Sequence, residues 1–390
     1  MALASGTSAD GIDVGVIDLE WGAGAEVTLR VMAADCQQWP TGLRDTILDL
    51  LPPRTTTAAR LCEIDTAIGQ ALAAVARQAM AGGGTDEVEL IVSPGQTVHH
   101  EVRDGQCLGT LQLGQPAWVA EGTGLPVVSD LRARDVSAGG HGAPLACTLD
   151  ALWLAGPDGP RAALNLGGIA NVTVVGDAGD DVVAWDTGPA NCLLDVAAAR
   201  ATSGAQRYDR DGRLAAAGQV RPDLLHRLLG HPYFRETPPA STGRETFSAA
   251  YLDGELDALP VVEPADLVAT VTELTAVTVA DALRPHSVVE VVASGGGTLN
   301  PVLMRSLAKA LGESRLVTSD SRGLPAAAKE VAMWALLGFL TWHGVPGSTS
   351  ATGARGPRIL GRISPGAAPL RLPEPVREPV RRLRVLQLAE

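Results

Sequence analysis

The sequence predicts an α/β protein made of two related lobes. Short apolar segments end in glycine-rich turns and lead into helical patterns, which is typical of mixed α/β architecture. The two halves also resemble each other, because residues 5–8 and residues 165–168 both lie between two short predicted strands. The 390 residues suffice for one large or two medium domains. We therefore expect two lobes with a cleft between them, a natural place for a nucleotide and a second substrate.

The expected boundary between the lobes lies near residue 130. The first lobe comprises residues 1–130, completed by part of the C-terminal region at about residues 345–390, and the second comprises residues 131–344. Few residues precede the first loop, so the first strand is either truncated or begins upstream. The segment 367–390 contains closely spaced prolines and charges, and we expect it to pack on the surface or to be partly disordered.

Apolar periodicity and turn residues define the expected elements. Helices are expected at residues 42–51, 58–81, 193–200, 222–229, 268–283, 301–311 and 331–342. Strands are expected at residues 88–92, 125–130, 162–166, 171–175, 182–185 and 287–293, with a strand, a turn and a strand within residues 1–18. Residues 131–145 are expected to form an arginine-rich loop.

Composition argues against several classes of function. The net charge is −13 and the 31 Lys and Arg residues are scattered, which argues against a nucleic-acid-binding surface. Five dispersed cysteines without a Cys-x-x-Cys motif are typical of reduced thiols in the cytoplasm. We see no basic-then-apolar leader, and the longest apolar run, residues 331–342, is too short to span a membrane. We expect a cytoplasmic protein that acts on a small molecule, without a nucleic-acid or membrane partner.

The first loop, residues 5–12, has the composition of a phosphate-binding turn. Its glycines permit turns that a Cβ would block, and Thr7 and Ser8 offer hydroxyl groups beside backbone N–H groups. Such a loop can surround the terminal phosphates of a nucleotide. Asp10 or Asp13 can anchor a magnesium ion, usually through water. A simple Gly/Ser turn of a hairpin has the same composition, so this loop alone leaves both interpretations open.

Four further segments contain residues suited to chemistry. Asp186 is the candidate general base, because it ends a predicted strand and opens a turn; the alternative is that it only caps this turn. The glycines of residues 294–297 allow close approach of adenine or ribose. Arg132 and Arg134 can bind a carboxylate or phosphate, or belong to a solvated ion-pair loop. Residues 241–245 could close over a substrate or cap the following helix.

Short motifs recur along nearly the whole chain, from about residue 4 to about residue 366. They lie at residues 5–13, 95–97, 132–135, 139–145, 165–171, 186–191, 241–245, 295–297, 300–301, 330, 352–354 and 356–358. In order and content this set resembles the anhydro-N-acetylmuramic acid kinases of the sugar kinase/heat-shock ATPase/actin superfamily. Any one motif is weak, but the set is specific.

The resemblance implies a two-lobed actin-like fold with a nucleotide cleft between the lobes. The implied enzyme is a homodimeric kinase that uses ATP and Mg²⁺. Its reaction converts 1,6-anhydro-N-acetylmuramic acid, water and ATP into N-acetylmuramic acid 6-phosphate and ADP, in the recycling of peptidoglycan. The implied catalytic base is Asp186, which would activate the water that attacks the anomeric carbon.

The resemblance also assigns binding residues. The implied ATP-binding positions are Ser5, Gly6, Thr7, Ser8, Ala9, Asp10, Gly11, Ile12, Gly167, Gly168, Gly295, Gly296 and Gly297. The implied sugar-binding positions are Thr97, Arg134, Asp135 and Glu330. Asp10 would hold Mg²⁺ through water.

One departure from the family pattern keeps alternatives open. Pro94 stands where the family usually has His, which removes an imidazole and a backbone N–H. This difference favours, as an alternative, a kinase of the same fold that acts on a different amino or anhydro sugar. A non-catalytic sugar or nucleotide sensor is a further alternative, but a sensor is expected to lose the base, and Asp186 is present.

Overall fold

The computed structural model describes residues 1–6, 8–51, 54–82, 88–103, 105–177, 181–238 and 240–387. The chain divides into two compact units: unit 1 comprises Met1–Trp153 and Gly323–Glu390, and unit 2 comprises Leu154–Arg322. Residues 131–153 and 323–344, which the sequence analysis assigned to the second lobe, therefore belong to unit 1.

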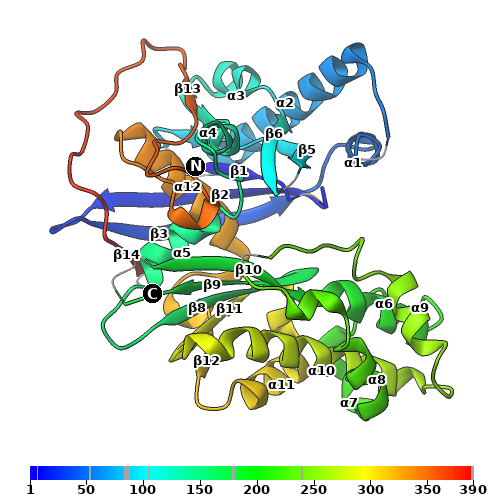
Figure 1. The fold of residues 1–390 in the computed structure, drawn as a ribbon. Coiled ribbons are helices and arrows are strands. Elements are labelled where there is room, and N and C mark those ends of the chain that lie inside the picture. The colour runs from blue at the N-terminus through cyan, green and yellow to red at the C-terminus, as the bar shows by residue number, and fades with distance from the viewer. Residues whose placement is uncertain are drawn as a thin grey trace. The chain divides into compact units, whose positions relative to one another are not determined.

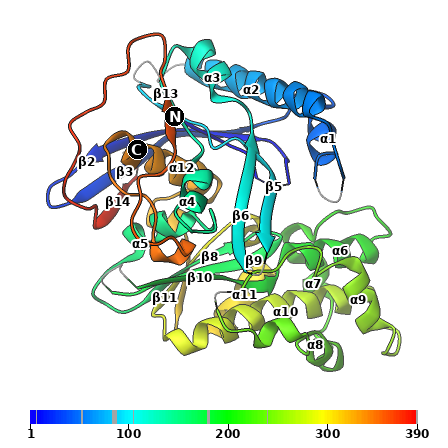
Figure 2. The ribbon, with the colours of Figure 1, turned by 45° about the horizontal axis from the view of Figure 1, so that its top comes forward.

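The sheet of unit 1 has seven strands in the order β13-β7-β4-β1-β2-β3-β14 (Figure 1). Its strands are β1 (Ala2–Ala4), β2 (Ile12–Trp21), β3 (Glu26–Gln37), β4 (Ile91–Val92), β7 (Val127–Ser129), β13 (Arg362–Ser364) and β14 (Arg382–Leu386). A separate two-stranded hairpin, coloured cyan in Figure 2, consists of β5 (Gln96–Arg103) and β6 (Gln106–Leu113).

Helices pack against this sheet, and one of them explains why residues 323–344 belong to unit 1. They are α1 (Leu43–Leu48), α2 (Ala58–Ala81), α3 (Pro116–Thr123), α4 (Leu131–Ser137), α5 (Ala146–Leu154) and α12 (Lys329–Trp342), with the short 3₁₀ turns η6 (Ala326–Ala328) and η7 (Ser350–Thr352). Helix α12 packs against β1, β2 and β4. The approach is close because Gly15 and Gly338 leave room for Val331 and Val92, respectively. This packing joins residues 323–344 to unit 1.

Unit 2 contains a five-stranded sheet in the order β10-β9-β8-β11-β12. Its strands are β8 (Arg161–Leu166), β9 (Ile169–Val175), β10 (Val182–Pro189), β11 (Glu290–Ser294) and β12 (Arg315–Thr318). Its helices are α6 (Asn191–Ala201), α7 (Arg213–Ala217), α8 (Pro222–Leu228), α9 (Ala249–Leu256), α10 (Pro264–Leu283) and α11 (Pro301–Leu311), and its 3₁₀ turns are η1 (Arg210–Gly212), η2 (Pro232–Arg235), η3 (Arg284–His286), η4 (Gly296–Leu299) and η5 (Asp320–Arg322). Helix α10 lies at the centre of the helical layer, against α6, α7, α8 and α11.

The two units share one topology. In unit 1, β3, β2 and β1 form an antiparallel run, and β4 and β7 continue it in parallel. In unit 2, β10, β9 and β8 form the same run, continued in parallel by β11 and β12. The predicted α/β class is confirmed, and the predicted likeness of the two halves is visible as a repeated strand order.

One local prediction was wrong, and the structure makes a second one more specific. Residues 131–137 form the helix α4 and not a loop, because Leu131 and Asp135, one helical turn apart, are both fully buried. The C-terminal segment ends in the edge strand β14, which pairs in parallel with β3. Leu383 is buried, and Arg382 and Arg384 lie beside Glu26 of β3. The alternation of exposed arginines with a buried leucine in β14 is typical of a strand.

Candidate active site

The first candidate phosphate loop joins β1 to β2 in unit 1. Thr7 lies outside the described residues. The N–H of Ala9 donates to the carbonyl of Gly6 over 3.0 Å, which closes a turn. The side chains of Ala9 and Ile12 are fully buried, so only their backbone can face a ligand. A Cβ on Gly11 would lie 2.7 Å from Cys36 Sγ, so this position requires glycine.

Two side chains from elsewhere in unit 1 hold this loop. Arg44 donates from Nε to the Ala9 carbonyl over 3.1 Å and from Nη2 to Asp10 Oδ1 over 2.9 Å. Gln96 Nε2 donates to the Gly6 carbonyl over 3.1 Å. The loop is therefore fixed from both sides before any ligand binds. Asp10 itself is 73% exposed.

The second candidate phosphate loop is the turn Gly167-Gly168 between β8 and β9, the equivalent place in unit 2. The N–H groups of Ala190 and Cys192 donate to the Gly168 carbonyl over 3.0 and 2.9 Å, and that of Asn191 donates to the Gly167 carbonyl over 3.1 Å. The start of α6 thus holds both carbonyls of the turn.

The candidate nucleoside loop follows β11 and packs on the end of β8. Gly295 has a φ of +86°, and a Cβ there would lie 2.7 Å from Asn165 Oδ1. A Cβ on Gly297 would lie 2.7 Å from the Cβ of Leu166, whereas Gly296 faces open space. Leu299, two residues after Gly297, is 80% exposed. An apolar side chain of such exposure beside a glycine turn can pack against a planar base.

The candidate base Asp186 lies within β10, which continues to Pro189 and contains a bulge between residues 186 and 188. The carboxylate Oδ2 accepts hydrogen bonds from Ser241 Oγ over 2.8 Å and from the N–H of Thr242 over 2.9 Å. Burial raises the pKa of Asp186, and Glu245 raises it further, while these two hydrogen bonds lower it. Its carboxylate therefore engages residues 241–242 and not the turn after it.

The loop 240–245 was left between two roles by the sequence, and its contacts distinguish them. The helix that follows, α9, is capped by Ser248, whose Oγ accepts from the N–H of Tyr251. Ser241 and Thr242 instead orient Asp186, whose N–H in turn donates to the Ala240 carbonyl over 3.0 Å. The sequence alone gave no spacing that connects this loop to Asp186.

A polar cluster in unit 1 contains one predicted sugar-binding residue, Glu330, and one arginine that was not assigned to the sugar, Arg132. The guanidinium of Arg132 lies 5.0 Å from the Trp334 ring centre, and its Nη1 donates to the Gly142 carbonyl over 2.7 Å. Part of the Glu330 residue is exposed to solvent. The protein atoms around its carboxyl group disfavour the charged form and therefore raise its pKa. Asp13 raises the same pKa further, while Arg132 opposes the rise.

The other predicted sugar-binding residues take different places. Asp135 is fully buried, and its carboxylate accepts from the N–H of Gly142 and from Thr352 Oγ1, both over 2.8 Å. Arg134 is exposed on α4. Thr97 lies on β5, where its Oγ1 accepts from Gln112 Nε2 over 3.3 Å. Asp135 thus supports the loop that holds Arg132, and its buried carboxylate is not presented to a ligand.

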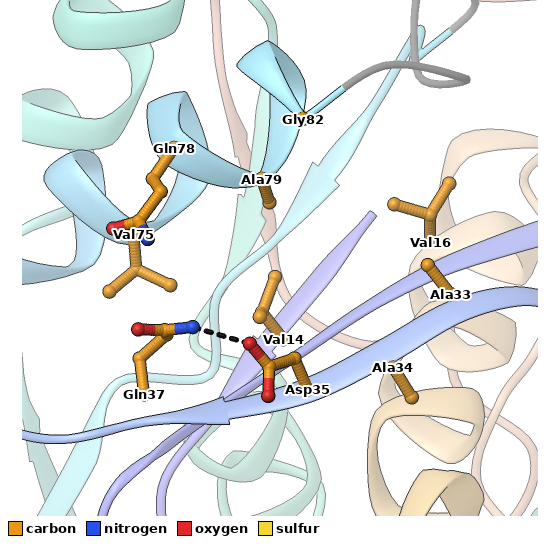
Figure 3. Close-up of a pocket in the computed structure, with 10 residues that line it drawn as sticks. All are labelled: Val14, Val16, Ala33, Ala34, Asp35, Gln37, Val75, Gln78, Ala79 and Gly82. Atoms are coloured by element: carbon orange, nitrogen blue, oxygen red, sulfur yellow. Dashed lines mark hydrogen bonds between the residues drawn. The ribbon is translucent and has the colours of Figure 1, made fainter.

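The pocket in Figure 3 lies between α2 and the strands β2 and β3, with a volume of about 270 Å³. Mainly small and apolar side chains line it, and Asp35 accepts a hydrogen bond from Gln37 at its edge. No predicted site residue lines this pocket. Elsewhere in the described part of the chain, no cluster of three or more His, Cys, Asp or Glu residues is arranged to hold a metal. No helix within the described ranges is long and apolar enough to cross a membrane.

Sequence comparisons with known proteins indicate one family along nearly the whole chain. A sequence model of the family described as anhydro-N-acetylmuramic acid kinase matches residues 1–366. Relatives named anhydro-N-acetylmuramic acid kinase include one from Streptomyces coelicolor, 53% identical over 99% of this chain and 98% of that protein, and one from Streptomyces avermitilis, 49% identical over 96% of each. A solved ROK family glucokinase from Streptomyces griseus, in complex with glucose and AMPPNP, has a TM-score of 0.39 at 14% identity, covering 86% of this chain and 98% of that one. The chain belongs to the anhydro-N-acetylmuramic acid kinase family.

Proposed function

We propose that this protein converts 1,6-anhydro-N-acetylmuramic acid, ATP and water into N-acetylmuramic acid 6-phosphate and ADP, and so returns cell-wall fragments to metabolism. Its membership of the family carries this proposal. The repeated pair of fixed glycine loops, one in each unit, supports it, because phosphoryl transfer depends on positioned phosphate groups.

Asp186 is the proposed general base. Its Oδ2 is oriented by Ser241 and Thr242, while Oδ1 accepts no hydrogen bond among the described residues. Oδ1 can therefore take a proton from water as the water oxygen bonds to the anomeric carbon. The bond from that carbon to the bridging O6 breaks as the new bond forms, and O6 bonds to the γ-phosphorus as the bond from phosphorus to the ADP oxygen breaks. The proton on Asp186 leaves to solvent. The raised pKa makes Asp186 a stronger base than an ordinary carboxylate.

The residues of both phosphate loops fit a nucleotide. Two hydroxyls, Ser5 Oγ in the first loop and Thr242 Oγ1 in the segment that holds Asp186, are buried and have no hydrogen-bond partner among the residues the structure describes. A buried hydroxyl without a partner costs about 1–3 kcal/mol, and a phosphate or substrate oxygen can supply the missing partner.

Mg²⁺ fits the first loop on the basis of donor chemistry. Asp10, Asp13 and Ser8 offer oxygen ligands, which Mg²⁺ prefers. Because Asp10 already pairs with Arg44, these residues would hold the ion through water, alongside phosphate oxygens. When bound, Mg²⁺ would neutralise charge on the phosphates.

Arg132, Glu330 and Thr97 are the proposed sugar-binding residues. The sugar carries a lactyl carboxylate, and a guanidinium can bind a carboxylate through two parallel hydrogen bonds. The structure favours Arg132 over Arg134 for this role, because Arg132 is the arginine fixed beside Glu330. We also propose a cytoplasmic homodimer, which light scattering and cell fractionation would test.

The deciding experiment measures ADP release by the purified protein with Mg-ATP and 1,6-anhydro-N-acetylmuramic acid. N-Acetylmuramic acid and N-acetylglucosamine serve as controls. Release with the anhydro sugar alone, with the 6-phosphate as product, supports the proposal. Release with another sugar alone moves the substrate and keeps the kinase, and no release with any sugar favours a sensor.

The Asp186→Asn variant tests the base. We expect it to bind ATP as the wild type does while kcat falls by about 10²–10⁴-fold, the usual contribution of a general base. Full turnover by this variant would remove Asp186 from the mechanism.

A kinase acting on another amino or anhydro sugar remains the second candidate, because of Pro94. Pro94 is buried between β4 and β5, next to Gly95, whose φ is +78°, and Gln96, which holds the first phosphate loop. The sugar panel above decides between the two candidates.

A further inference from the structure

Arg244 covers the second glycine turn of unit 2. A Cβ built on Gly168 would lie 2.9 Å from Arg244 Nε, 3.0 Å from Nη2 and 3.3 Å from Cζ. The guanidinium therefore lies directly against the turn, in the space that any other residue at position 168 would fill. Arg244 is nevertheless exposed to solvent.

The charge of Arg244 is not used in a structural ion pair. The ion pairs found among the described residues of unit 2 engage Arg161, Arg200, Arg213, Arg221, Arg227, Arg284, Arg315 and Arg322. Arg244 influences the carboxyl group of Asp195 on α6: burial raises the pKa of Asp195 to about 6, and the charge of Arg244 opposes this rise. Arg244 is thus positioned but not neutralised by a direct partner.

Arg207, Arg210, Arg235 and Arg305 of unit 2 also lie outside these ion pairs, but the atoms nearest to Gly168 belong to Arg244. Lys309, on α11, is the one lysine in residues 154–322 of the sequence, and the chain as a whole carries a net charge of −13. A polyanionic nucleotide is therefore repelled by the overall field and needs a local positive charge. Arg244 supplies that charge at the turn.

The loop 240–245 connects this arginine to the proposed base. The same short loop donates two hydrogen bonds to Asp186 Oδ2 from Ser241 and Thr242. Arg244 and Asp186 are therefore positioned by one piece of backbone.

We propose that Arg244 binds the phosphates of ATP at the Gly167-Gly168 turn and stabilises the negative charge that develops during phosphoryl transfer. This inference rests on the proposed function and adds one catalytic residue to it. The planar guanidinium matches two phosphate oxygens through parallel N–H groups, which a lysine ammonium cannot do. Stabilisation of developing charge by a fixed donor contributes about 10²–10³-fold to kcat.

The test compares Arg244→Ala and Arg244→Lys with the control Arg305→Ala, which removes the same charge from an exposed position on α11. We expect Arg244→Ala to lose about 10²–10³-fold in kcat/KM for ATP while KM for the sugar is unchanged. Calorimetry should show weaker binding of ATP but unchanged binding of adenosine. Arg244→Lys should lose less in ATP binding than in kcat, and the control should match the wild type.

Added guanidinium ion gives a second readout, because a rescue of activity shows that the variant is folded and lacks only the missing group. It should restore part of the activity of Arg244→Ala and none to Asp186→Asn. Wild-type values of kcat and ATP binding in Arg244→Ala would overturn the inference. If the wild type binds ATP but phosphorylates no sugar in the panel, the proposed function fails. Weaker ATP binding by Arg244→Ala would in that case still support Arg244 as a phosphate ligand. Unchanged ATP binding by Arg244→Ala would overturn this role as well.

Discussion

Replacing Asp135 separates a supporting role from a role in contact with substrate. Asp135 Oδ2 accepts from the N–H of Gly142, and Oδ1 accepts from Thr352 Oγ1. The Gly142 carbonyl in turn accepts from Arg132 Nη1. Asp135 therefore fixes the position of Arg132 through the turn at residue 142, and we expect its substitution to act through the loop.

The size of the effect follows from these contacts. Asp135→Ala removes two hydrogen bonds to a buried carboxylate, each worth about 1.5–3 kcal/mol, and leaves the Gly142 N–H without a partner. Thr352 can still donate to the Thr349 carbonyl over 3.0 Å, which limits the loss. We expect a destabilisation of about 3–5 kcal/mol. Asparagine can replace both bonds, since its oxygen accepts from Gly142 and its amide donates to Thr352 Oγ1.

Thermal unfolding measures the loss of stability in the Asp135 variants, and steady-state kinetics measures their activity. For a unit of this size 1 kcal/mol shifts Tm by about 2–4 °C, so Asp135→Ala should lower the Tm of unit 1 by about 10 °C. Asp135→Asn should stay near the wild-type Tm and retain most of kcat. The control Asp18→Ala removes an exposed ion pair with Arg30 and should cost less than about 1 kcal/mol. If Asp135→Asn keeps its Tm but loses kcat as strongly as Asp186→Asn, the carboxylate acts on the substrate and the reasoning fails.

Three other changes have defined outcomes. Because the folded-state pKa of Asp195 is raised to about 6, the folded protein binds more protons than the unfolded chain between about pH 4 and 6. Stability should therefore fall as the pH rises through that window, and Asp195→Asn should remove this dependence in Tm measurements. The rate should likewise fall on acidification, at a higher pH than for an ordinary aspartate, because Asp186 must be unprotonated and burial raises its pKa. A pH profile of kcat without this acidic limb would contradict the assignment. Deleting residues 367–390 should expose the edge of β3 and lower the Tm of unit 1, and Leu383→Ala should reproduce a loss of about 2–4 kcal/mol of this stability.

The sequence predicted elements best where end signals agree with periodicity. The bounds of α2 and α11 match the prediction, because Thr57 and Asn300 cap them with side-chain oxygens and the apolar spacing is regular. The strand β4 is only two residues long, although five residues read as a strand, because its neighbours β1 and β7 are short too. The pairing of β14 with β3 joins residues more than 350 positions apart, and no local signal contains it.

The site shows the same division between local and long-range information. Glycine turns and an aspartate followed by Thr-Gly-Pro are local patterns, so both candidate phosphate loops and Asp186 could be named from the sequence, although β10 continues past Asp186 to Pro189. The choice between Arg132 and Arg134 could not be made, because it depends on the phase of a helix that was predicted as a loop. With α4 as a helix, Arg132 follows the buried Leu131 and lies over Trp334, and Arg134 is exposed. No apolar spacing indicates this helix, because the residue one turn after Leu131 is the charged Asp135, whose burial only the structure shows.

The repeated topology explains why we propose the same role for two unlike loops. In each unit the glycine loop connects the central strand to its antiparallel neighbour, β1 to β2 and β8 to β9. A parallel strand borders the central strand on its other side, β4 in unit 1 and β11 in unit 2, so the loop emerges where the carboxyl ends of parallel strands meet. Ligands bind at such ends in α/β sheets because the chain leaves the sheet there and frees its backbone groups. The two loops differ in what holds them, Arg44 and Gln96 in one case and the start of α6 in the other. The position of each loop therefore follows from the strand order, whereas the chemistry at each loop follows from the side chains packed around it, and this is why Arg244 could be recognised only from the structure.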